Sequence, residues 1–72
     1  MKKKSQFSTV ITFESGDSHT EDTPKEKLGS TIQRLLNGPA AIAGLIKEFK
    51  IIANADDTII LHVINGLVVF PN

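Results

Sequence analysis

The sequence predicts an α+β fold, in which a small antiparallel sheet carries two short helices on one of its faces. Three observations lead to this prediction. Residues 6–14 alternate between apolar and polar side chains with the period of a strand. Residues 23–49 contain two apolar stripes with helical spacing. Residues 58–70 form two apolar runs on either side of Asn65-Gly66, a residue pair that favours a tight hairpin turn.

The first strand is predicted over residues 6–14, and an exposed loop follows it. Phe7, Thr9, Ile11 and Phe13 share one side of this strand and give it an apolar face. The segment 15–22 begins with turn-forming residues and then shows no periodicity, so we expect it to lack regular structure.

Two helices are expected next. Thr23 is placed to cap the first helix, with Pro24 at its first position and Glu26 completing a capping box. We expect Gly38 to end this helix in the left-handed conformation that glycine adopts at little cost. Pro39 then begins the second helix. The two apolar stripes comprise Leu28, Ile32, Leu35 and Leu36, and then Ile42, Leu45, Ile46 and Phe49.

Residues 50–53 either continue the second helix or form a short fourth strand, and their β-branched side chains favour the strand. The expected element order is therefore β-α-α-(β)-β-β. Residues 6–72 are expected to form a single domain behind a flexible basic tail at residues 1–5.

The hairpin over 58–70 is apolar on both faces. A two-residue turn pairs Ile64 with Leu67, Val63 with Val68, His62 with Val69 and Leu61 with Phe70. The helices can cover one face, and burying four large side chains on the other contributes roughly 6–12 kcal/mol. We therefore expect a homodimer, although a monomer whose helices wrap both faces is the alternative. The predicted interface consists of Ile60, His62, Ile64, Leu67 and Val69.

Composition excludes several classes of function. The 72 residues include no cysteine, which argues against a disulfide framework and favours a cytoplasmic location. Eight basic and eight acidic residues give no net charge, which argues against strong nonspecific attraction to nucleic acid or anionic lipid. No apolar run is long enough to span a membrane. The basic residues at the start are followed by polar ones, so no secretion signal is predicted.

No residue pattern predicts catalysis, a metal site or a cofactor. The spacing of Asp17, His19, Glu21 and Asp22 matches no metal-binding loop, and no nucleophile accompanies Asp57 or His62. We also expect the chain to be too short to build a deep pocket of the usual size, about 300–1,000 Å³, and still keep a core. At an interface, His62 would make association pH-dependent, since imidazole titrates near pH 6.5.

The predicted function is therefore that of a small, non-enzymatic, cytoplasmic binding or accessory protein that forms a homodimer through its hairpin. A second protein could bind an exposed sheet edge or the acidic segment 14–22. Small chains of this kind suit an inhibitor or accessory factor of a phage or other mobile element. The alternative is a nucleic-acid-binding protein that contacts phosphates through Lys2, Lys3, Lys4, Lys25, Lys27 and Arg34.

Overall fold

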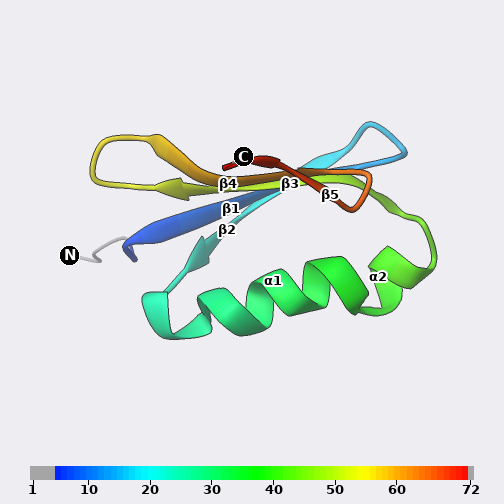
Figure 1. Ribbon diagram of the computed structural model, residues 1–72, viewed down its shortest axis with the longest axis horizontal. Coiled ribbons are helices and arrows are strands. Elements are labelled where there is room, and N and C mark those ends of the chain that lie inside the picture. The colour runs from blue at the N-terminus through cyan, green and yellow to red at the C-terminus, as the bar shows by residue number, and fades with distance from the viewer. Residues whose placement is uncertain (1–4, 72) are drawn as a thin grey trace.

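The computed structural model describes residues 5–71 and shows two layers, an antiparallel sheet and a helical layer on one of its faces (Figure 1). The predicted α+β class, with helices on one face, is confirmed. The five strands lie in the order β2-β1-β3-β4-β5. In sequence order, the elements are β1 (Phe7–Phe13), β2 (Ser18–Thr23), a 3-10 turn (Lys25–Lys27), α1 (Leu28–Asn37), α2 (Pro39–Ile42), β3 (Ile46–Ala53), β4 (Thr58–Ile64) and β5 (Leu67–Phe70).

The segment expected to be an exposed loop contains strand β2, so that expectation is wrong. Gly16 has a φ of 97° in the turn after β1, and the Phe13 N–H donates to the Asp17 carbonyl. The returning strand pairs with β1 along its whole length. Strand β2 lies at the edge of the sheet and its side chains are mostly exposed, so it shows no apolar alternation. It is a strand because its backbone pairs with β1.

Thr23 does not cap the helix as predicted. Its hydroxyl is buried and lies 2.6 Å from the buried hydroxyl of Thr9 on the neighbouring strand. The helix instead begins through a 3-10 turn after Pro24, and α1 starts at Leu28 without a side-chain cap. A buried hydroxyl needs a hydrogen-bond partner, and the Thr9 hydroxyl supplies one for Thr23. The Thr23 side chain is therefore used within the sheet and not as a helix cap.

Gly38 separates the two helices, but not in the predicted left-handed conformation. Its φ is −77° and its ψ is 179°, which is extended backbone. A Cβ at this position would lie 2.3 Å from the Arg34 carbonyl oxygen. Glycine is therefore needed here for space, not for a positive φ.

The second helix is a single turn, and the predicted fourth strand is longer than expected. Strand β3 begins at Ile46, so Ile46 and Phe49, which fit the predicted helical stripe, belong to the sheet. Phe49 lies opposite Ile11 of β1 and Val63 of β4. Its side chain is 1% exposed, so burial between two strands overrides the helical spacing of this segment.

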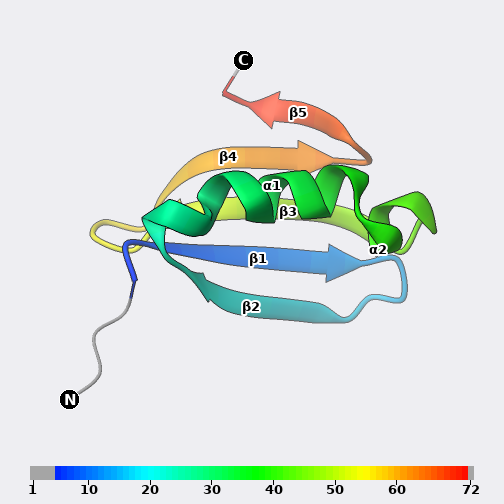
Figure 2. The same ribbon diagram turned by 90° about the horizontal axis from the view of Figure 1, so that it is seen from below.

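The core lies between α1 and the middle of the sheet. Buried Leu35 from α1 clusters with Ile11, Phe49 and Val63 from three neighbouring strands. Figure 2 shows α1 running across β3, while β2 and β5 lie towards the two sides. The helical layer therefore seals the centre of one face and leaves the outer strands less covered.

One bulge changes the predicted register of the hairpin, and another lies between β3 and β4. The pairs nearest the turn, Ile64–Leu67 and Val63–Val68, form as expected. A shift between His62 and Val63 then places Phe70 opposite His62, so the predicted partners of His62 and Leu61 are wrong. A second shift, between β3 and β4, places Ile59 opposite Ile52. The bulges leave Ile60 and Val69, both in the predicted interface, without a cross-strand partner.

Candidate functional site

The face of the sheet turned away from α1, here called the open face, has a charged centre. The His62 Nε2 atom lies 2.7 Å from the Glu48 Oε1 atom. This hydrogen bond is the main reason that the pKa of Glu48 is lowered. Lys50 lies directly opposite His62 and next but one to Glu48 along β3. The sequence predicted an apolar face here, because that prediction considered the hairpin alone. Strand β3 pairs with the hairpin and adds the charged side chains of Glu48 and Lys50 to this face.

Strand β5 concentrates the exposed apolar side chains at one edge of the sheet. All four of its residues are exposed, from 42% for Val69 to 71% for Leu67. Among residues 5–71, no strand pairs with its outer side, which leaves backbone N–H and C=O groups available there. An apolar edge strand of this kind is a ready template for pairing with another strand.

The predicted interface residues are only partly brought together. Ile64 and Leu67 lie opposite each other, and His62 lies two residues before Ile64 on the same strand. Phe70, which was not predicted, lies opposite His62 and lines a hollow with it and Ile59. Ile60 and Val69 are exposed bulge residues. We define the β5 surface as Ile60, Leu67, Val68, Val69 and Phe70.

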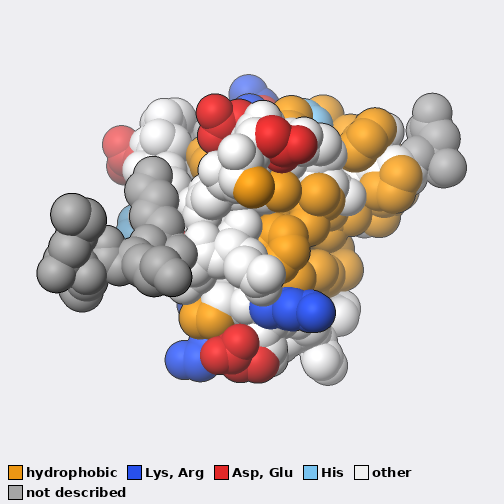
Figure 3. Space-filling model, turned by 90° about the vertical axis from the view of Figure 1, so that its left-hand side faces the viewer, with side chains coloured by type: hydrophobic (Ala, Val, Ile, Leu, Met, Phe, Trp, Pro, Cys, Tyr) orange, Lys and Arg blue, Asp and Glu red, His pale blue; other side chains and the backbone are white. Residues whose placement is uncertain are grey.

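Hydrophobic side chains continue from β5 towards one flank of α1. Arg34 of α1 faces the other way, because its guanidinium is paired with Glu21 of β2. Leu36 lies two positions later, about 200° around the helix, and therefore points towards the β5 side. It is 37% exposed. Figure 3 shows hydrophobic side chains gathered on the flank of the molecule to which β5 belongs.

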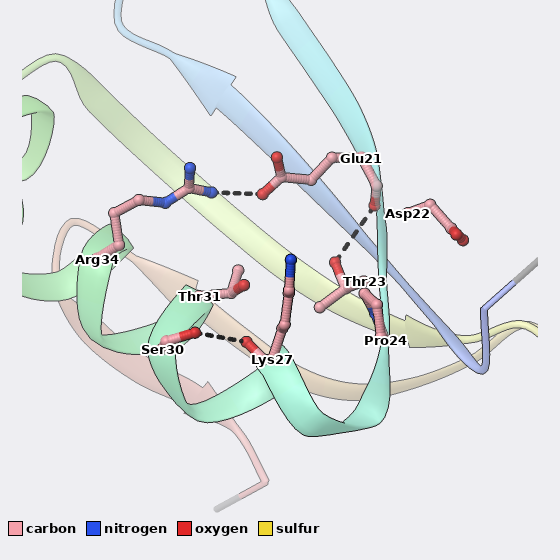
Figure 4. A pocket seen from close by; sticks show the side chains of 8 residues that line it. All are labelled: Glu21, Asp22, Thr23, Pro24, Lys27, Ser30, Thr31 and Arg34. Carbon is pink, nitrogen blue, oxygen red and sulfur yellow. Dashed lines mark hydrogen bonds and ion pairs between the residues drawn. The ribbon is translucent and has the colours of Figure 1, made fainter.

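The opposite flank of α1 faces β2 across a cleft. One hollow of about 480 Å³ is lined by residues that include Glu21, Lys27, Thr31 and Arg34 (Figure 4). A second, of about 370 Å³, lies towards α2. Both hollows are open to solvent, so the expectation that this short chain cannot build a deep pocket stays a prediction. Lys27 and Arg34 are seven residues apart and share a helix face, a signal present in the sequence. The facing wall could not be predicted while β2 was expected to be a loop.

The described cations do not form a continuous positive surface. Arg34 is paired with Glu21. Lys27 lines the same hollow as Glu21 and Asp22, and Lys25 is followed directly by Glu26 in the 3-10 turn. Lys2, Lys3 and Lys4 lie outside the described residues. Acidic neighbours thus accompany each described cation of the predicted phosphate-binding set.

The remaining polar residues have structural partners. Asp56 lies in the turn before β4, where hydrogen bonds from Thr58 lower its pKa, and the Thr58 N–H lies 3.1 Å from its Oδ1 atom. Within residues 5–71, no three histidine, aspartate or glutamate side chains are grouped so as to hold a metal ion. The described helices are all too short to cross a membrane.

Comparisons with known proteins give no indication of function, so function is inferred from the geometry of the described residues. No family model, curated protein or solved structure matches this chain.

Proposed function

We propose that this chain is a small, non-enzymatic binding or accessory protein that acts in the cytoplasm as a homodimer, joined through the β5 surface. The observation that supports the proposal best is the exposure of all four residues of β5, each apolar, at an edge of the sheet that has no partner in the described chain.

The apolar exposure is large enough to favour association. Fully burying one such side chain contributes about 1.5–3 kcal/mol, and those of β5 are roughly half exposed. Covering the four therefore contributes roughly 3–6 kcal/mol before the cost of association. A stable interface buries about 800 Å² on each partner, roughly one-sixth of the 5089 Å² surface of this chain. Since the four residues of β5 are too few to bury this area, the proposed interface also includes Ile60 of the β5 surface and Leu36 of α1 next to it.

The two edges of the sheet differ in a way that favours a closed pair. Strand β2, at the other edge, carries Ser18, His19, Thr20, Glu21 and Asp22. Pairing β5 with β2 of another copy would set apolar against charged side chains and would generate a ring or an open filament. Pairing β5 with β5 of a second copy matches apolar with apolar. It also closes after two subunits related by a two-fold axis.

Light scattering after size exclusion, over a micromolar range of concentrations, tests this proposal. The wild-type chain should have twice the mass of one chain. Leu67→Lys should give a folded monomer, because Leu67 is already 71% exposed and the change removes little from the core. Thr20→Lys, at an exposed position on the polar edge strand, is the matched control and should remain dimeric.

A wild-type chain that remains a monomer throughout this range would contradict the proposal. So would a dimer whose mass is unaffected by both Leu67→Lys and Phe70→Lys. Circular dichroism of each variant establishes that any monomer is folded.

A further inference from the structure

The cleft between α1 and β2 combines a polar and an apolar hollow. Glu21 and Arg34 line both of them, so their ion pair lies where the two meet. This cleft lies on the flank of α1 away from the β5 surface. A ligand held in the cleft would lie away from that surface, so we expect its binding not to depend on dimer formation.

The hollow towards α2 is suited to an apolar ligand. Its walls include Phe13 and Ile46 from the sheet, Leu35 from α1, and Pro39 and Ala40 from α2. Its volume of about 370 Å³ lies within the range of known small-molecule sites, about 300–1,000 Å³. Such sites have mainly apolar walls and a few polar groups that orient the ligand.

Arg34 supplies a cationic group to the lining of this hollow, beside His19 and Glu21. Its guanidinium has five N–H donors, and the described ion pair joins one of its nitrogens to Glu21 Oε1. The other carboxylate oxygen of Glu21 lies 3.9 Å from His19 Nε2. Donors of Arg34 therefore remain for a second carboxylate, which a guanidinium binds in a two-pronged geometry.

Two cations and one inward-facing carboxylate line the part of the cleft next to Arg34. The Lys27 ammonium group points into the polar hollow, as Figure 4 shows. Asp22 lines the hollow too, but its carboxylate points away and accepts hydrogen bonds from the Ser5 N–H, at 3.0 Å, and from the Ser5 hydroxyl, at 2.6 Å. Lys27 and Arg34 thus face the cleft against the single carboxylate of Glu21.

We propose that this cleft binds a medium-chain aliphatic carboxylate. The hydrocarbon tail lies among Phe13, Leu35 and Ile46, and the carboxylate accepts hydrogen bonds from Arg34. A cationic amphiphile of the same length is repelled by Arg34 and Lys27, and a neutral alcohol lacks the charge-assisted bonds.

Titration of the full chain with octanoate, octanol and octylamine, followed by amide NMR, tests the site. Octanoate, below its micelle concentration, should give saturable shifts at residues that line the apolar hollow. Octanol should bind about tenfold more weakly, because it loses charge-assisted hydrogen bonds. Octylamine should bind more weakly than octanol.

Three variants assign the binding to particular groups. Arg34→Gln should weaken octanoate about tenfold and leave octanol unchanged, a separation that a general loss of structure would not produce. Glu21→Gln should strengthen octanoate several-fold, because it removes the competing carboxylate. Ala40→Phe should fill the hollow and abolish binding of both ligands. Ala43→Phe is its matched control, because Ala43 is exposed and does not line the hollow.

Unsaturable shifts with octanoate, or octylamine binding as tightly as octanoate, would overturn the proposal. Equal effects of Arg34→Gln on octanoate and octanol would overturn the assignment of the carboxylate to Arg34. Because β5 is untouched, light scattering of these variants should give the wild-type mass, so failure of this site is distinguishable from failure of the dimer.

Discussion

Replacing the two buried threonines, singly and together, tests how the sheet is joined to the start of the helical layer. The hydroxyls of Thr9 and Thr23 lie 2.6 Å apart, and both residues are almost fully buried, at 0% and 2% exposure. Thr23→Val removes the only described partner of the Thr9 hydroxyl. An unsatisfied buried hydroxyl costs about 1–3 kcal/mol of unfolding free energy. The single change should therefore destabilise the protein by that amount.

The reverse change should cost less. In Thr9→Val, the Thr23 hydroxyl retains a weak hydrogen bond to the Glu21 carbonyl, at 3.4 Å. The double variant leaves no hydroxyl unsatisfied, so it should lie within about 1 kcal/mol of wild type. The order of stability is then wild type and double variant, followed by Thr9→Val and last Thr23→Val.

Urea unfolding, monitored by circular dichroism at one fixed protein concentration, gives these free energies. A double-mutant cycle extracts the coupling between the two sites, expected at about 1–3 kcal/mol. Additive losses, with the double variant as unstable as the sum of the two singles, would refute the argument. They would show that the side chains contribute through packing alone and not through their shared hydrogen bond.

Three further predictions concern other parts of the fold. Gly38→Ala should lower the melting temperature, because its Cβ would meet the Arg34 carbonyl oxygen. Gly38→Asn should lower it at least as much. A glycine needed for a positive φ would instead tolerate asparagine, and Gly38 has an extended backbone. Phe49→Ala should cost about 3–5 kcal/mol in urea unfolding, and a loss under 1 kcal/mol would contradict its central place in the core. The hydrogen bond from His62 lowers the folded-state pKa of Glu48, so it stabilises the fold above the ordinary carboxyl pKa of 4.5 and is lost as the pH falls through the lower, folded value. Glu48→Gln should therefore weaken the loss of stability below about pH 4.5, by at most about 1 kcal/mol, and an unchanged pH profile in acid would contradict this linkage.

The strong local patterns of the sequence predicted the elements to which they belong. Alternation identified β1, and Asn65-Gly66 identified the turn between β4 and β5. The helical stripe of α1 correctly placed Leu35 in the core. These signals succeed because hydrophobic period and turn chemistry are properties of short segments.

The errors arose where a distant partner decides the structure. Strand β2 has no apolar face, and its pairing with β1 is visible only in three dimensions. Phe49 fits a helical stripe, yet two neighbouring strands bury it in the sheet. The bulges that displace Ile60 and Val69 carry no turn residue that would indicate them.

The candidate sites were predictable to different extents. Exposed apolar β5 follows from the hairpin pattern, although the charged cluster around Glu48 and His62 could not be foreseen without β3. The cleft required β2 and the contact between Glu21 and Arg34, which are thirteen residues apart.

The position of β5 in the chain has a consequence for synthesis in the cell. This strand emerges from the ribosome after β1, β3 and β4, whose side chains form most of the core. Because domains begin to fold while they are being made, the exposed apolar edge follows the strands that form the body of the sheet. Moving this segment ahead of β1 by circular permutation would display it throughout translation, and we expect such a chain to accumulate in inclusion bodies.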